Sequence, residues 1–193
     1  MQLDETREAL NKFAKYVIQE SKNNLDKSDK NFSKELYNSL GYDLNVSKNS
    51  FSLSLLMKDY GVFQDKGVKG KDPSKVIGGK KAIRGQQAPN SPYKFGSGNY
   101  SGQWSKFVGK LEVWAKRKGY RLRDEKGRFK KGNYKTIAQI IAGNIYNRGI
   151  RPSMFFTKPF EKAFKGLDEE LIKAYALDVE KFMDFTIKDN LKK

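Results

Sequence analysis

The chain has 193 residues, which is enough for one domain with an elaboration or for two small domains, and it contains no cysteine and no histidine. Disulfide bonds and thiolate metal sites are therefore excluded, and so are the most common general base and metal ligand. The net charge is +17, because 39 lysine and arginine residues outnumber 22 acidic residues, and this excess points to a negatively charged partner.

The first elements in chain order are predicted to be helices followed by a β-hairpin. Apolar residues recur every three or four positions over residues 4–24, which is typical of a helix with one buried face. A short amphipathic helix over residues 33–40 comes next. Apolar and polar residues then alternate over residues 42–46 and 51–57, and turn residues separate the two runs. A hairpin with one buried face needs cover, which the flanking helices can supply.

The middle of the chain is predicted to be less regular. Residues 59–64 fit a short helix or turn, and residues 66–99 are rich in glycine, proline, lysine and serine, which predicts a long loop. Apolar residues at helical spacing predict a helix that starts near Trp104 and that Gly119 ends. A basic turn or short hairpin is expected around residues 126–127.

Further helices complete the chain. An isoleucine-rich stripe predicts a helix over residues 134–148 that Gly149 ends. An apolar turn follows and leads into a helical start, with Pro159 at an early position that tolerates proline. The last helix covers residues 167–190 and begins with acidic residues, which suits the helix dipole. Its apolar residues predicted to pack on the hairpin are Leu171, Tyr175, Val179, Phe182 and Phe185.

The positive charge is concentrated in one segment. Residues 66–132 contain 19 basic and 4 acidic residues, whereas the rest of the chain contains 20 basic and 18 acidic residues. The sequence predicts an α+β frame of residues 1–65 and 133–193, in which a small hairpin-based antiparallel sheet packs against N- and C-terminal helices. A long basic insertion of residues 66–132, with one or two helices, interrupts this frame. An insertion of that length is usually functional.

No feature of the sequence predicts catalysis. The glycine clusters lack the spacing of phosphate-binding loops, and the acidic residues do not cluster as a metal site requires. We therefore expect no enzyme, no catalytic residue, no metal site and no cofactor. No apolar run approaches the roughly 18 residues of a membrane span, and the N-terminus does not resemble a signal peptide. We expect a soluble protein that is made in a cytoplasm and has no membrane partner.

The basic insertion is the predicted contact with DNA or with an acidic protein surface. The residues assigned to this contact are Lys66, Lys69, Lys71, Lys80, Lys81, Arg84, Lys116, Arg117, Lys118, Arg121, Arg123, Arg128, Lys130 and Lys131. Aromatic residues alternate with these cations and could stack on nucleic-acid bases, although burial in a core or an interface is their more common role. They are Tyr93, Phe95, Tyr100, Trp104, Trp114, Tyr120 and Phe129.

Three short motifs of the frame resemble one known family. The segment Leu36–Leu40 precedes the hairpin, Tyr60–Gly67 follows it, and Pro152–Pro159 leads toward the last helix. Together they resemble the tail-completion and head–tail joining proteins of tailed bacteriophages. The resemblance covers the frame, whereas the long basic insertion departs from the family.

The resemblance implies a virion protein that forms a homo-oligomeric ring, commonly twelve-fold, in the neck through which the genome passes, after assembly in the host cytoplasm. It implies no catalysis, and the implied partners are the portal or other neck and tail ring proteins. Phage DNA, bound without sequence preference, is a further candidate partner. The residues predicted to contact neighbouring subunits are Tyr60, Phe63, Trp104, Trp114, Phe155 and Phe156.

Two other functions stay open at this point. A free nucleic-acid-binding protein outside the virion would explain the basic insertion. A nuclease or other DNA-processing enzyme would need converging carboxylates, which the insertion lacks. On the ring hypothesis, the insertion extends from the frame as an arm that clasps adjacent subunits, and its lysines meet acidic neighbours or DNA. A closed ring seen by electron microscopy would favour this hypothesis over the other two.

Overall fold

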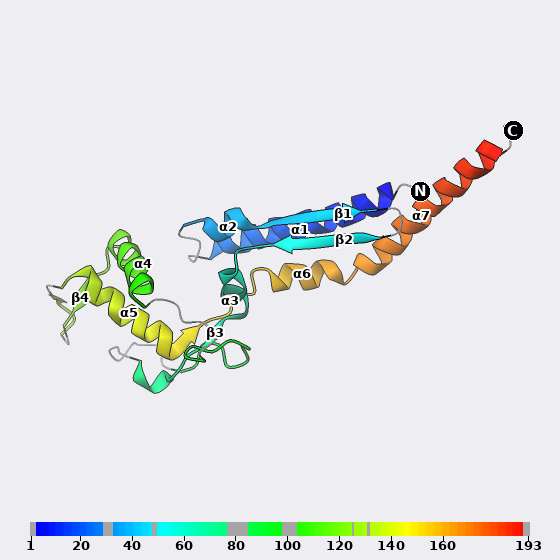
Figure 1. Ribbon diagram of the computed structural model, residues 1–193. Coiled ribbons are helices and arrows are strands. Elements are labelled where there is room, and N and C mark those ends of the chain that lie inside the picture. Colours follow the sequence, from blue (N-terminus) through cyan, green and yellow to red (C-terminus); the bar gives the residue numbers. More distant parts are fainter. Residues whose placement is uncertain are drawn as a thin grey trace. The chain divides into compact units, whose positions relative to one another are not determined.

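The computed structural model describes residues 3–28, 33–47, 50–76, 85–97, 104–124, 126–130 and 132–190. In these residues the fold is α+β, as predicted, with seven α-helices, one 3₁₀ helix and three antiparallel two-stranded sheets (Figure 1). The chain divides into two compact units. Unit 1 comprises Met1–Gly61 and Met154–Lys193, and unit 2 comprises Val62–Ser153.

Unit 1 contains a hairpin and four helices within the described residues. In chain order they are α1 (Asp4–Lys27), α2 (Glu35–Ser39), β1 (Gly41–Val46), β2 (Phe51–Leu56), α6 (Thr157–Phe164) and α7 (Leu167–Asn190). Both strands lie along α1, which also packs against α6 and α7 (Figure 1). The N- and C-terminal helices therefore pack with the small sheet, as the sequence pattern predicted.

The register of the hairpin confirms the predicted inner face. Tyr42 lies opposite Leu55, and Leu44 lies opposite Leu53. These side chains are partly buried, whereas the polar residues that alternate with them are exposed. Because successive side chains of a strand point to opposite faces, this alternation leaves one apolar face for the helices.

Two clusters of buried side chains form the core of unit 1. The first contains Ile18, Leu25, Leu36, Leu40 and Phe155, and the second contains Phe13, Val17 and Leu167. Helix α1 contributes to both clusters, because its apolar residues recur at the spacing that places them on one face.

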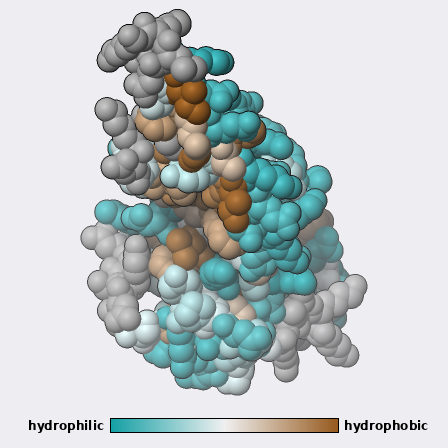
Figure 2. Space-filling view, turned by 90° about the vertical axis from the view of Figure 1, so that its right-hand side faces the viewer, coloured by the Kyte–Doolittle hydropathy of each residue, from teal (hydrophilic) through white to brown (hydrophobic). Residues whose placement is uncertain are grey.

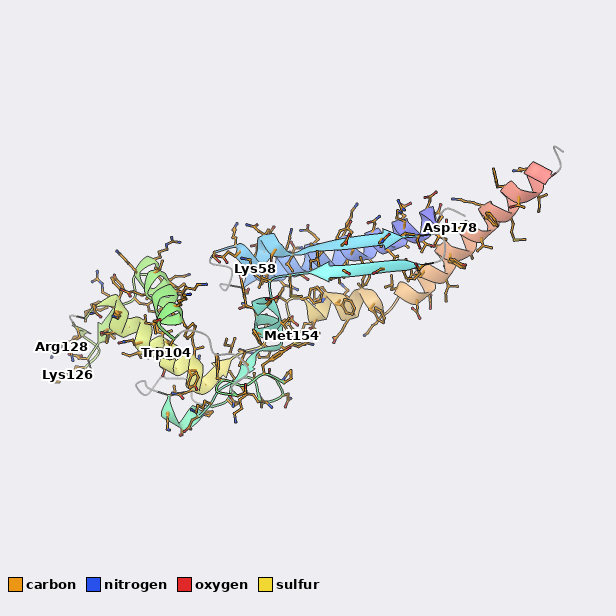
Figure 3. All side chains as sticks on the ribbon, viewed as in Figure 1. Lys58, Trp104, Lys126, Arg128, Met154 and Asp178 are labelled. Carbon is orange, nitrogen blue, oxygen red and sulfur yellow. The ribbon has the colours of Figure 1, made fainter. Side chains whose placement is uncertain are left out.

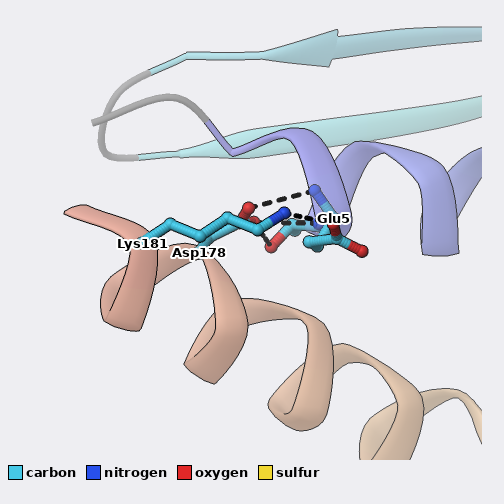
Figure 4. Close-up of polar contacts among 4 residues, drawn as sticks. Glu5, Asp178 and Lys181 are labelled. Atoms are coloured by element: carbon cyan, nitrogen blue, oxygen red, sulfur yellow. Dashed lines mark hydrogen bonds and ion pairs between the residues drawn. The ribbon is translucent and has the colours of Figure 1, made fainter. Parts of the chain in front are cut away.

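A long-range cap joins α7 to the first turn of α1. The carboxylate of Asp178 accepts hydrogen bonds from the backbone N–H of Glu5 at 3.0 Å, the backbone N–H of Thr6 at 2.9 Å and the Thr6 hydroxyl at 2.8 Å (Figure 4). Leu3, which precedes α1, provides no side-chain cap, so Asp178 satisfies N–H groups that would otherwise lack partners. Burial raises the pKa of Asp178, but the hydrogen bonds from Thr6 and Glu5 lower it by more, and the net pKa lies below its ordinary value.

Unit 2 contains the remaining elements. In chain order they are α3 (Tyr60–Lys66), which begins at the boundary between the units, β3 (Val68–Lys69), the 3₁₀ helix η1 (Pro73–Lys75), α4 (Trp104–Arg117), β4 (Leu122–Arg123), β5 (Phe129–Lys130), α5 (Tyr134–Arg148) and β6 (Gly149–Ile150). The predicted short helix after the hairpin, both predicted helices of this region and the basic hairpin are all present.

The apolar stripe of α4 packs on α5. Val108 is buried against Ala138 and Ala142, and Phe107 and Leu111 lie beside this contact. Because both residues from α5 are small, the two helices bury few large side chains between them.

The strands β3 and β6 approach so closely that two glycines are required. Val68 pairs with Ile150 across the two strands. A Cβ atom on Gly149, whose φ is +96°, would lie 2.2 Å from the carbonyl oxygen of Val68. A Cβ atom on Gly70 would lie 2.0 Å from the carbonyl oxygen of Asn147. Neither position has room for a side chain.

The division into units differs from the one that the charge pattern suggested. The prediction placed residues 133–193 in the frame and residues 66–132 in an extended insertion, whereas α5 and β6 belong to unit 2. The physical reason is that α4 packs on α5 and that β3 pairs with β6. The described part of the insertion is therefore not a separate arm, because it folds together with residues 133–153.

Candidate functional site

The β4–β5 hairpin of unit 2 has two different faces. Leu122, Tyr134 and Ile137 help to line a hollow on one side of the hairpin, which Arg121 and Lys130 also border. Arg123 pairs with Phe129, and both belong to the alternate face. The side chain of Phe129 is 62% exposed. One face of the hairpin thus lies toward the start of α5, and the other is open to solvent.

Two guanidinium groups lie over the ring of Phe129. The Cζ atoms of Arg123 and Arg121 are 4.5 Å and 5.5 Å from the ring centroid, which are distances of cation–π contacts. Arg123 also donates a hydrogen bond from Nη1 to the carbonyl oxygen of Gly127 at 3.0 Å. The structure therefore brings two predicted contact residues together on one aromatic side chain.

The tip of the hairpin carries further cations. The carboxylate of Asp124 accepts a hydrogen bond from the backbone N–H of Arg128 at 2.8 Å and so closes the turn. Gly127 has a φ of +79°, a conformation that favours glycine. Figure 3 shows Lys126 and Arg128 at this tip. Both side chains are exposed.

A second acidic residue of the insertion also serves a local turn. The carboxylate of Asp72 accepts hydrogen bonds from the hydroxyl and backbone N–H of Ser74 and lies 3.4 Å from the Nζ atom of Lys75. The hydrogen bond from the Ser74 hydroxyl is the main cause that holds the pKa of Asp72 below its ordinary value. Asp72 and Asp124 are therefore engaged locally.

The other predicted cations lie outside the hairpin tip. Lys69 in β3 has its backbone anchored to Tyr93 and Phe95, and Lys71 places Nζ 5.7 Å from the ring centroid of Tyr146. Cations at the end of a helix also offset its dipole, and those in the last turn of α4 are Lys116 and Arg117, which Lys118 follows. Lys66 ends α3, and Lys130 pairs with Leu122 in the hairpin. The predictions for Lys80, Lys81, Arg84 and Lys131 fall outside the described residues.

Two of the aromatic residues predicted to contact neighbouring subunits are exposed. Tyr60 is 42% exposed, and Trp104, at the start of α4 in Figure 3, is 48% exposed. Partial burial, followed by the charge of Glu35, raises the pKa of the Tyr60 hydroxyl. The Trp104 ring also contacts Tyr146 at a centroid distance of 6.0 Å.

The other aromatic residues of that set pack within their own units. Phe63 lies edge-to-face with Tyr93 at a centroid distance of 4.7 Å, and Trp114 stacks on Tyr120 at 5.0 Å. Phe155 is only 1% exposed and belongs to the core of unit 1, so its role is packing and not the predicted contact with a neighbour. Phe156 is partly buried against both core clusters of that unit.

Helix α7 exposes apolar side chains that were not predicted to be exposed from the sequence. Of the α7 residues expected to pack on the hairpin, Leu171 joins the cluster that contains Leu53 and Leu55. Tyr175, Phe182 and Phe185 are exposed, which corrects that prediction. We call the exposed apolar residues of α7 the α7 row; they are Ile172, Tyr175, Leu177, Phe182, Met183, Phe185 and Ile187. Figure 2 shows exposed hydrophobic side chains beside hydrophilic ones on the face that it views.

The length of α7 explains the exposure of its last residues, which include Phe182 and Phe185. Asp178 and Lys181 contact the first turn of α1, so the α7 residues beyond them pass the end of that helix. A helix of 24 residues spans about 36 Å, whereas a strand of six residues spans about 20 Å. The hairpin is therefore too short to cover the whole of α7. A comparison of the predicted lengths of the last helix and of the hairpin strands could have shown that the helix is longer than the strands.

Neither a metal site nor a membrane-spanning helix is present in the part of the chain that the structure describes. No three acidic side chains gather there in a group that could hold a metal ion. No described helix combines the length and the apolar character that crossing a membrane requires.

The chain was also compared with known proteins. The comparisons with models of protein families, with curated proteins and with solved structures found no match.

Proposed function

We propose that the protein is a non-catalytic structural subunit that assembles with copies of itself into a ring in the head–tail connector of a tailed-phage virion. The observation that carries self-assembly is the α7 row. The assignment to a connector rests on the three motifs at Leu36–Leu40, Tyr60–Gly67 and Pro152–Pro159. The portal and other neck or tail ring proteins are the neighbours that this assignment names.

The α7 row supports an intermolecular contact because its distal part has no cover in the described structure. Residues 181–188 are all exposed, and four of them are large apolar side chains: Phe182, Met183, Phe185 and Ile187. A helical segment of this length is unstable in water unless it packs on something. Several large apolar side chains that gather on one uncovered helical segment indicate an interaction site.

A second copy of the same chain fits this surface by charge. Helix α7 (Leu167–Asn190) contains seven acidic and three basic residues, a net charge of −4. Residues 66–132 carry a net charge of +15. Neighbouring copies therefore offer each other surfaces of opposite sign. A ring joins two different surfaces of each subunit, and this charge asymmetry suits that kind of contact.

The oligomeric state of the purified full-length chain tests the proposal. We expect native mass spectrometry to find a closed oligomer and negative-stain electron microscopy to show rings. The variant Phe182→Ser/Phe185→Ser should dissociate into monomers, because it removes two large apolar side chains from the α7 row. A matched control, Asp184→Ser/Lys188→Ser, changes two exposed residues of the same segment without changing the net charge and should still assemble.

Two results would contradict the proposal. A wild-type chain that stays monomeric at high concentration would remove its basis. Rings that form equally well with the Phe182→Ser/Phe185→Ser variant would show that the α7 row does not mediate assembly. A monomer that nevertheless binds DNA would favour a nucleic-acid-binding protein that acts outside a virion.

A further inference from the structure

We infer that the β4–β5 hairpin binds the phosphate backbone of double-stranded DNA through Arg121 and Arg123, whose guanidinium groups the ring of Phe129 holds in place. This inference deepens the proposed function by naming what unit 2 binds, and it rests on that function only for the source of the DNA. Its physical basis lies in unit 2, whereas the apolar contact proposed for self-assembly lies on α7 in unit 1.

The first step is the orientation of the two arginines. Leu122 belongs to the face that borders the hollow with Tyr134 and Ile137, so the alternating residue Arg123 belongs to the solvent face. Its cross-strand partner Phe129 lies on that same face and is 62% exposed. Arg121 precedes the strand and borders the hollow, but its side chain is exposed as well. A large ligand can therefore reach both arginines.

The second step is their preorganisation. Both guanidinium groups lie within 5.5 Å of one ring centroid, and Arg123 is further held by its hydrogen bond to Gly127. Long side chains lose rotamer entropy when they bind, and contacts that already restrict them reduce this loss. A guanidinium group is planar and presents a fork of N–H donors that matches the geometry of a phosphate.

The third observation is that, in the described part of the hairpin, the donors are not neutralised. The carboxylate of Asp124 is engaged by the backbone N–H of Arg128 in the turn. Among the described residues, no carboxylate forms a salt bridge with Arg121 or Arg123. The hairpin therefore presents a positive charge that a ligand can neutralise.

The size of the positive charge indicates which ligand the hairpin binds. The net charge of −4 on a neighbour's α7 is far smaller than the +15 of residues 66–132. A DNA duplex supplies about one negative charge per 1.7 Å of its axis, so it can balance a charge of this size. Contacts to phosphates carry no sequence information, and we therefore expect binding without sequence preference.

The salt dependence of DNA binding tests the inference on the full-length chain. The probe is a fluorescent duplex of about 30 base pairs, and anisotropy gives the affinity over a range of NaCl concentrations. The variant Arg121→Gln/Arg123→Gln should lower the slope of log K against log salt by about 1.8, since each phosphate contact contributes about 0.9. The matched control Lys15→Gln/Lys158→Gln removes the same charge from exposed positions of unit 1 and should keep the wild-type slope.

A second variant tests the role of the ring. Phe129→Leu keeps an apolar side chain of similar size but removes the aromatic face, while both arginines remain. We expect the affinity to fall about two- to fivefold, which corresponds to a cation–π contact at an exposed site, with the salt slope unchanged. Circular dichroism should show that each variant keeps the helical content of the wild type.

Several outcomes would overturn the inference. Equal salt slopes for Arg121→Gln/Arg123→Gln and Lys15→Gln/Lys158→Gln would show that the charge of the whole chain, and not the hairpin, binds DNA. Tighter binding of polyglutamate than of DNA at equal charge concentration would identify an acidic protein as the partner. A preference for single-stranded DNA, or no binding of the duplex, would reject the duplex backbone as the ligand. Native mass spectrometry of the same variants distinguishes a loss of DNA binding from a loss of self-assembly. A variant that forms rings but does not bind DNA would contradict only this inference, and a monomer that binds DNA would contradict only self-assembly.

Discussion

The two units of this chain are stabilised in different ways. Among the described residues, unit 1 buries twelve apolar side chains, of which two are alanine, whereas unit 2 buries seven, of which four are alanine. Unit 1 therefore gains most from the burial of large side chains such as Phe155 and Leu25. Unit 2 has a similar length but carries most of the positive charge, and among the described residues it buries fewer large apolar side chains.

Unit 2 compensates with backbone contacts. The side chain of Gln86 accepts a hydrogen bond from the backbone N–H of Gly70 at 2.6 Å and donates one to its carbonyl oxygen at 3.2 Å. The Ser91 hydroxyl donates to the carbonyl oxygen of Gly67 at 2.7 Å. A region with a strongly charged surface can thus be stabilised by hydrogen bonds from side chains to its backbone.

The largest expected effect is in the core of unit 1. Phe155→Ala removes a fully buried ring between α1 and α2, and large-to-small changes of this kind cost about 3–5 kcal/mol. Val108→Ala in unit 2 removes two methyl groups and should cost about 2 kcal/mol. Urea unfolding followed by circular dichroism measures both changes. Equal losses would mean that the cores of the two units do not differ as their composition indicates.

The next effect concerns the backbone of unit 2. Gly149→Ala places a Cβ atom against the carbonyl oxygen of Val68 and imposes a positive φ on a residue that disfavours it. We expect a loss of about 2–4 kcal/mol in the free energy of unfolding. Gly143→Ala is the control, because it lies inside α5 with open space around its Cβ position and should stabilise the chain by about 0.5–1 kcal/mol. If both variants destabilised the protein equally, the close approach of β3 and β6 would be irrelevant to stability.

The long-range cap of unit 1 gives a smaller effect that depends on pH. Asp178→Asn keeps the shape but removes the charge and one acceptor for the first turn of α1, which should cost about 1–3 kcal/mol at pH 7. Because the pKa of Asp178 is lower in the folded chain than in the unfolded chain, its stabilisation is complete above about pH 4 and is lost as the pH falls through the folded pKa. The difference between wild type and variant in urea unfolding should therefore shrink in acid. Asp184→Asn, an exposed neighbour on the same helix, should change stability little at any pH.

The sequence predicted local structure better than it predicted contacts between distant segments. The alternation in β1 and β2, and the glycines after α4 and α5, act within a few residues, so they could be recognised without the fold. The cap by Asp178 joins residues 172 and 173 positions apart, and nothing in the local pattern marks it. The α4–α5 contact uses Ala138 and Ala142, which add little to a hydrophobic pattern that isoleucines dominate.

The candidate site shows the same limit. The charge of residues 121–131 and their turn were evident from the sequence, and they identified the arginines. The pairing of Arg123 with Phe129 depends on the hairpin register, and the exposed α7 row depends on where α1 begins beside α7. Both are properties of packing, and the charge pattern alone had favoured an extended arm.

The smallest expected effect tests whether a local cap is weaker than the long-range one. The Oδ1 atom of Asn133 accepts hydrogen bonds from the backbone N–H of Thr136 at 2.8 Å and from its hydroxyl at 2.7 Å, at the N-terminus of α5. Both residues are exposed, so water can replace the lost acceptor in Asn133→Ala, and we expect a loss of about 1 kcal/mol. Asn133→Asp keeps the acceptor and adds a negative charge that favours a helix N-terminus, so it should match or exceed the wild type. A loss for Asn133→Ala as large as that for Asp178→Asn would contradict the difference between the units, since it would make an exposed cap in unit 2 as important as a buried one in unit 1.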